Sequence, residues 1–138
     1  MTLNLAQRTA LLSTLIHLER ALIETEQMLD RPPSGVTFTT EVDWSEACAQ
    51  DLRSLCAAAR SQIAEMVDVF GLPVQHLNGR RIVVGEMSIA WVNLEELRPE
   101  RLRRYGDVDP ALSETLTPRL ERLMEQVLAI QSLASQQT

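Results

Sequence analysis

The chain has 138 residues, of which 45% are hydrophobic, 23% are charged and 4% are aromatic. This length fits a single domain over residues 1–138, and the apolar content argues against a disordered chain. The formal net charge of -6 argues against a general nucleic-acid binder, which needs a basic surface. All 13 basic residues are arginine, and the absence of lysine excludes a P-loop lysine and a Schiff-base lysine.

The cysteines and the N-terminal residues indicate the cellular compartment in which the protein is expected. Cys48 and Cys56 fall within one expected helix, where eight steps of about 1.5 Å separate them by roughly 12 Å, too far for a disulfide. A reducing compartment is therefore expected. Residues 1–8 lack the basic start and apolar run of a signal peptide, and no segment approaches the ~20 apolar residues of a membrane span. We expect a cytoplasmic protein that does not bind membranes.

The first long helix is expected from residue spacing. Leucines recur every three or four residues through the first segment, and Pro32-Pro33 ends the pattern. These positions form one wide apolar face on a helix of about 25 residues. The leucines are Leu11, Leu15, Leu18, Leu22 and Leu29.

Two further long helices are expected. Asp43 and Glu46 have the spacing of a capping box at the start of the second helix, and Gly71 is suited to a left-handed C-cap at its end. The last helix carries apolar residues at spacings of three and four from Leu116 to Ala134. Within it, Pro118 marks a first turn or a kink.

The middle of the chain is less regular. Residues 74–77 and 80–84 flank Asn78-Gly79, the sequence typical of a type I′ turn in a β-hairpin. The β-branched residues 36–40 could add a third strand or remain an extended loop, so whether residues 36–42 and 74–84 form a sheet stays open.

Short helices are expected after this hairpin. Residues 88–97 suggest a short helix, followed by a turn or two from Pro99 to Tyr105 and a brief helix that starts at Asp109-Pro110. The expected fold is therefore mainly α: a helical bundle of three long helices with short helices and a small β-hairpin inserted before the C-terminal helix. In this fold, residues 74–116 form a smaller layer over the bundle.

No catalytic, cofactor or metal site is expected. The sequence has no Glu-x-x-His pair of the di-iron type, no Gly-rich phosphate loop and no nucleophile elbow. His17, His76 and the two cysteines do not have the spacing of zinc ligands. We expect neither a cofactor nor catalytic residues.

His17 raises one alternative. Histidine phosphotransfer domains are helical bundles of about this size, in which an exposed histidine is followed by basic and small residues. Here Arg20 and Ala21 follow at suitable places, but Glu19 stands where that pattern has an apolar residue, and its charge would repel a phosphoryl group. The chain is not identified as a member of that family, and a phosphotransfer module that uses His17 remains a third hypothesis.

The basic segment around residue 100 departs most from the acidic background. Residues 80–104 carry a net charge of +2, so the rest of the chain carries -8. Arg98, Arg101 and Arg104 recur at spacing three and would share one face of a helical turn. Arginine and aromatic residues are enriched in protein–protein interfaces. These arginines either form a docking surface or pair with acidic residues of the same chain.

Two functions from different classes follow. The first is a non-catalytic helical-bundle protein that acts through protein–protein contacts, either with itself as a homodimer or with an acidic partner. It rests on the apolar face of the first helix, which is wider than one core needs. The second is a ligand-binding protein or enzyme with a pocket between the bundle and the 74–116 layer, where Trp44 or Trp91 would line an apolar cavity. Tyr105 is expected to anchor the basic segment by packing.

Overall fold

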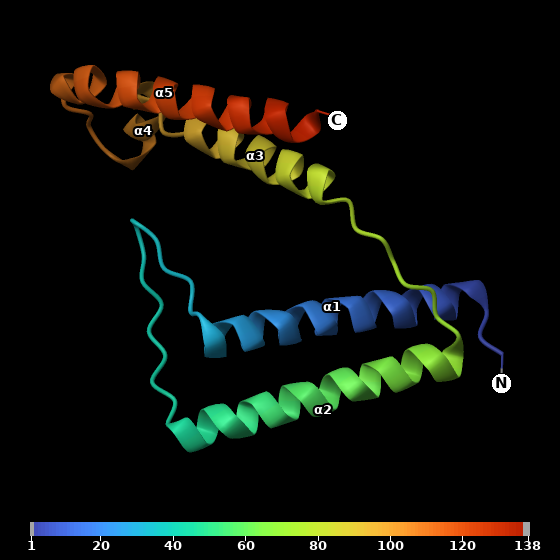
Figure 1. Cartoon of the computed structure of the whole chain (residues 1–138). Coiled ribbons are helices and arrows are strands. Elements are labelled where there is room, and N and C mark those ends of the chain that lie inside the picture. The colour runs from blue at the N-terminus through green and yellow to red at the C-terminus, as the bar shows by residue number, and fades with distance from the viewer. Residues whose placement is uncertain (1, 137–138) are drawn as a thin grey trace. The chain divides into compact units, whose positions relative to one another are not determined.

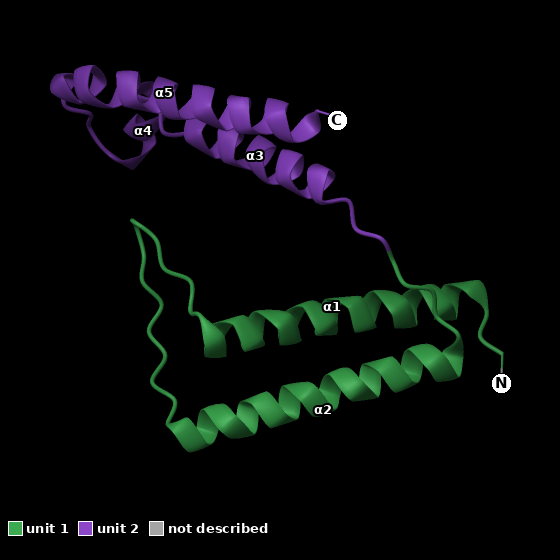
Figure 2. Ribbon diagram, in the orientation of Figure 1, with its two compact units in different colours: residues 1–75 green, residues 76–138 purple. Residues whose placement is uncertain are grey.

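The computed structural model describes residues 2–136, and its regular structure is helical throughout that range (Figure 1). The described chain forms two compact units, residues 1–75 and 76–138, each of which is described by itself (Figure 2). The expectation of a mainly α fold is confirmed, whereas the expected three long helices are joined by a fourth, α3, and residues 2–136 contain no strand. The expectation of one domain over the whole chain stays a prediction.

Helix α1 (Leu5–Asp30) begins at a reciprocal cap. The Asn4 side chain accepts a hydrogen bond from the Gln7 amide at 2.8 Å, and the Gln7 side chain accepts one from the Asn4 amide at 3.0 Å. These bonds satisfy two of the amides that a helix N-terminus leaves without partners. The helix ends before Pro32, as its sequence predicts.

Helix α2 (Glu46–Phe70) starts later than the expected cap at Asp43. Ser45 is the N-cap, and its hydroxyl accepts a hydrogen bond from the Cys48 amide at 3.1 Å. The cap expected at Asp43 was therefore wrong. Serine and aspartate cap helices about equally well, so the sequence alone does not decide between Asp43 and Ser45. At the other end, Gly71 has φ 60° and ψ 43°, which confirms the left-handed C-cap.

The core of the first unit lies between α1 and α2. Leu15, Ile63 and Leu72 are buried together, and half-buried apolar residues from both helices pack around them. Arg8 fixes one end of the pair, because its guanidinium donates to the Phe70 and Gly71 carbonyls at 3.3 and 2.6 Å. These bonds satisfy carbonyls that the end of α2 cannot pair within the helix.

The connection between α1 and α2 contains no strand. Residues 36–42, for which a strand was one of two expectations, form an irregular loop in the described chain. The Gly35 amide donates to the Phe38 carbonyl at 2.9 Å across a bend at residues 36 and 37.

Helix α3 (Gly79–Glu95) replaces the expected β-hairpin. A type I′ turn needs positive φ at both central residues, whereas Asn78 has φ -94° and Gly79 is not among the described residues with positive φ. Asn78 acts as the N-cap, and its side chain accepts a hydrogen bond from the Arg81 amide at 3.2 Å. The same Asn-Gly pair therefore starts a helix, and the β-branched residues after it lie within the helix.

The rest of the second unit follows the expected boundaries more closely. Helix α4 (Pro99–Leu102) and the single turn η1 (Arg103–Tyr105) end at Gly106, which has φ 145°. Helix α5 (Pro110–Ser135) begins at the expected Asp109 cap but continues through Pro118 as one long helix. The brief helix and the last long helix of the sequence analysis are therefore a single element.

The core of the second unit lies where α5 packs along α3. Its buried residues, Leu120, Met124 and Val127, are all on α5 at spacings of four and three. Gln131 of α5 donates from its amide to the Val84 carbonyl at 3.2 Å and to the Ser88 hydroxyl, which ties the two helices together. None of the helices in residues 2–136 is long and apolar enough to cross a membrane.

Candidate interaction site

The basic segment lies on α4 and η1, and its arginines face carboxylates of their own unit. The Arg98 guanidinium donates to Glu95 and lies 3.9 Å from Glu121. Arg104 binds Glu96 at 2.7 Å, and Arg101 lies 3.9 Å from the same carboxylate. The three arginines therefore converge on carboxylates at the end of α3.

Arg98 is the most enclosed of the three arginines. Its side chain is more than two-thirds covered, and one of its nitrogens lies 3.9 Å from the Met124 sulfur. The hydrogen bond to Glu95 raises the pKa of Arg98; burial opposes that rise, and the charges of Glu95, Glu121 and Glu100 add to it. This arginine is a structural contact between α4, α3 and α5.

Arg101 and Arg104 remain more than half exposed. Surface ion pairs contribute about 0–1 kcal/mol each, so an acidic partner can replace Glu96 at little cost. The structure thus separates the expected surface into one enclosed arginine and two accessible ones. That these residues bind a partner stays a prediction.

The three candidate aromatic residues lie in different surroundings. Tyr105 is 77% exposed, with the Arg104 guanidinium 5.1 Å from the centre of its ring. Trp91 is half-buried on α3, and Trp44 is exposed just before the cap of α2. Tyr105 therefore presents its ring to solvent beside the Arg104 guanidinium group, and does not anchor the basic segment by being buried, as the sequence analysis expected.

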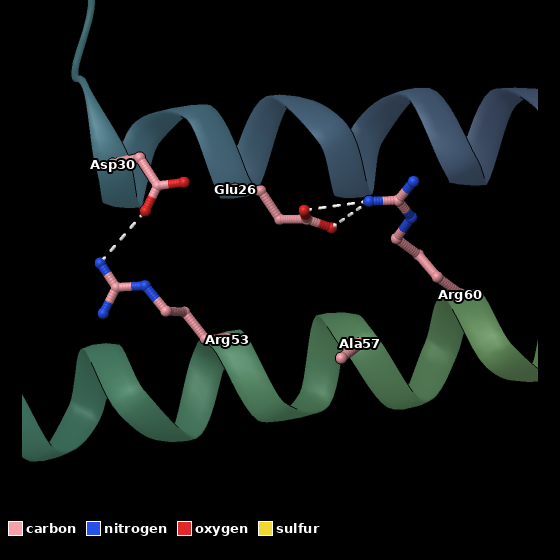
Figure 3. A pocket seen from close by; sticks show the side chains of 5 residues that line it. All are labelled: Glu26, Asp30, Arg53, Ala57 and Arg60. Atoms are coloured by element: carbon pink, nitrogen blue, oxygen red, sulfur yellow. Dashed lines mark hydrogen bonds and ion pairs between the residues drawn. The ribbon is translucent and has the colours of Figure 1, made fainter.

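A polar pocket of about 200 Å³ opens between α1 and α2 (Figure 3). Arg60 donates to both oxygens of Glu26 at 3.0 and 3.1 Å, and Arg53 lies 3.3 Å from Asp30. Ala57 is the only apolar residue in its lining. Both inter-helix ion pairs line this pocket, and Glu26, Asp30 and Arg60 also line an adjacent groove of about 600 Å³.

The remaining candidates for chemistry are dispersed. His17 is exposed on α1, Cys48 is exposed and Cys56 is buried, both as free thiols. Within residues 2–136, no cluster of three or more histidine, cysteine or acidic side chains could hold a metal ion. The pocket expected between the bundle and the 74–116 layer stays a prediction.

The largest feature that sequence reasoning missed is an apolar face on α3. We define the outer face of α3 as Ile82, Gly85, Ile89 and Val92, all of which are exposed. It was missed because residues 80–84 were assigned to a strand and residues 88–97 to a separate helix. The sequence does contain an indication of one continuous helix with an apolar face, because among residues 82–94 only Glu86, Ser88 and Asn93 are polar.

Comparisons of the chain with protein-family models, with curated proteins and with solved structures found no match.

Proposed function

We propose that this chain is a non-catalytic helical protein that acts through protein–protein contacts and forms a homodimer. The observation that supports this most strongly is the distribution of apolar side chains. Among the described residues, 21 large hydrophobic side chains are exposed, whereas seven residues form the buried cores. Ile82, Ile89 and Val92 recur along α3, and an apolar strip of this kind is typical of an interface, because its exposure to water is unfavourable.

The two helix pairs explain why the surplus arises. Two packed helices bury only the stripe that each turns toward the other, so apolar residues outside that stripe stay in contact with solvent. On α1, Leu18 and Ile23 lie outside the stripe, as the width of the expected apolar face implies. On α3 and α5 the surplus is larger, and a twofold homodimer is the commonest way to cover such surface.

Light scattering coupled to size exclusion tests the homodimer. The 15.5 kDa chain should elute with about twice that mass at concentrations above its dissociation constant. A monodisperse species of 15.5 kDa up to several hundred micromolar would contradict self-association.

A second partner class is supported by Arg101 and Arg104. Both guanidinium groups are exposed, and that of Arg104 lies beside Tyr105, a composition that favours binding to carboxylates on another protein. We propose that an acidic protein surface, in a second copy of this chain or in another protein, binds there.

A further inference from the structure

Helix α3 has apolar residues on two opposite faces. Val84, Met87, Trp91 and Leu94 are half-buried on the side packed along α5, and the outer face lies about 150° around the helix from them. No residue of α3 is fully buried, although 13 consecutive residues from Ile82 contain only three polar ones. A helix that is apolar on all sides is typically covered on all sides.

The outer face forms a regular strip. Ile82, Gly85, Ile89 and Val92 follow one another at spacings of three, four and three, the a/d pattern by which one helix packs against another. The three large side chains are 45%, 61% and 55% exposed. The strip is therefore suited to one partner helix lying along it.

Gly85 gives an independent indication of a close partner. A glycine inside a helix costs roughly 0.5–1 kcal/mol relative to alanine. Gly85 does not have a positive φ, and a Cβ added there would meet nothing within 4 Å. Nothing within its own unit requires a glycine, whereas a second helix crossing at this position would.

The strip is complementary to itself when reversed. In an antiparallel pair with its twofold axis at residue 87, Ile82 of one copy faces Val92 of the other, and Ile89 faces Gly85. Each large side chain of the strip then meets either another large one or the gap at the glycine, and both copies make the same contacts, as twofold symmetry requires. A parallel pair would set Ile89 against Ile89 and leave Gly85 against Gly85.

Charges at the ends of the strip agree with this direction. Glu96 lies on the same side of the helix as the strip, one position beyond α3. Reversal places its carboxylate beside the N-terminal turn of the other copy, where Arg81 and the free helix amides favour negative charge. Because Glu96 already accepts a hydrogen bond from Arg104, this attraction contributes little to dimerisation, and most of the contribution comes from apolar packing.

We propose that the outer face of α3 binds the same face of a second copy in an antiparallel, twofold arrangement, with Ile89 seated over Gly85 of the partner. The proposal rests on the proposed homodimer and specifies where it forms. Two α3 helices then lie at the centre of a four-helix arrangement, each flanked by its own α5. The strip is short, so we expect a dissociation constant in the micromolar range.

The first test places a charge in the strip. Ile89→Glu should weaken dimerisation at least a hundredfold in light scattering or analytical ultracentrifugation, with unchanged helical circular dichroism. Leu55→Glu is the matched control, because Leu55 is 67% exposed on α2 and lies outside the strip. This control should dimerise as the wild type does.

The outcomes separate the proposals. A monomeric wild type contradicts both the homodimer and its location. A dimeric wild type with a dimeric Ile89→Glu variant contradicts the location alone. A monomeric wild type in which Ile89→Glu lowers the melting temperature shows that a surface of the same chain covers the strip.

The second test remains decisive if Ile89→Glu does not fold. Gly85→Ala adds one methyl group where the unit has open space, so it should preserve or raise the stability of the monomer. In the proposed dimer the methyl group meets Ile89 of the partner, and the dissociation constant should rise about tenfold or more. Unchanged or tighter dimerisation in this variant overturns the proposal.

Crosslinking tests the direction. In a Cys48→Ser background, which removes the exposed thiol, mild oxidation of Ile82→Cys/Val92→Cys should link residue 82 to residue 92 across chains, as identified by peptide mass spectrometry. Links of residue 82 to 82 and of 92 to 92 would show parallel packing and overturn the antiparallel arrangement.

Discussion

Arg98, Arg101 and Arg104 have equal spacing in the sequence but different roles in the structure. Arg98 is covered by Glu95, Met124 and Glu121, whereas Arg101 and Arg104 share one carboxylate at the surface. The difference arises because Arg98 precedes α4 and contacts Met124 and Glu121 of α5, whereas Arg101 lies within α4 and Arg104 within η1. Spacing alone therefore cannot separate a structural arginine from a binding one.

This difference leads to a prediction for paired variants. Arg101→Gln/Arg104→Gln should weaken binding to an acidic partner in a salt-dependent way, because exposed charges are screened over about 8 Å at physiological salt. The melting temperature should change little, since each exposed ion pair contributes about 0–1 kcal/mol. Calorimetric titration of an acidic model peptide at two salt concentrations measures the effect.

Arg98→Gln is the control. It should lower the melting temperature more than the paired variant does, because it removes a charge-assisted hydrogen bond at a partly covered site, and it should leave partner binding nearly unchanged. If the paired variant unfolds while Arg98→Gln does not, the exposed arginines are structural and the docking surface is wrong.

At the scale of the helices, α5 continues through a proline. Pro118 lacks the amide that would donate to the Glu114 carbonyl, and the Arg119 side chain donates to the adjacent Thr115 carbonyl at 2.8 Å. The helix persists because its buried residues, Leu120, Met124 and Val127, all follow the proline and anchor it along α3.

Pro118→Ala should therefore stabilise the protein. Alanine restores the backbone hydrogen bond and removes the ring, so the free energy of unfolding should rise by about 1–3 kcal/mol in denaturant titrations. Ser113→Ala, at an exposed position of the same helix, should change it by only a few tenths. Destabilisation by Pro118→Ala would show that packing along α3 requires the bend of the proline.

Most helices could be predicted from the sequence because their signals are local. Pro32-Pro33 and Gly71 fixed the ends of α1 and α2, and Asp109-Pro110 fixed the start of α5. Helix α3 could not be predicted, because Asn78-Gly79 suits both a turn and a helix cap, and an apolar run such as 82–94 suits a buried strand as well as a helix. The outer face of α3 was missed for the same reason, since it exists only if residues 82–92 form one helix.

At the scale of the whole molecule, two small cores hold the described chain. Each lies between two long helices, and seven residues of the described chain are buried. The cores are small, so association through the proposed dimer surface should add to the stability of the folded chain.

Thermal unfolding should accordingly depend on protein concentration. Above the dissociation constant, the melting temperature should rise by about 2 °C for each tenfold increase in protein, because the dimer is favoured by mass action. Gly85→Ala should reduce this dependence in the same concentration range. A melting temperature that is constant from one to several hundred micromolar would contradict coupling between folding and association.

Each helix pair is contiguous in the sequence, since α1 packs with α2 in residues 1–75 and α3 with α5 in residues 76–138. During synthesis, α1 and α2 leave the ribosome together with every residue that their shared core needs. That core can close while α5 is still being translated, because domains generally fold as units from the N-terminus onward. The outer face of α3, by contrast, can be covered only by a second, completed chain, as proposed above. The local concentration of the protein at the site of translation would therefore determine how long that face stays exposed to chaperones.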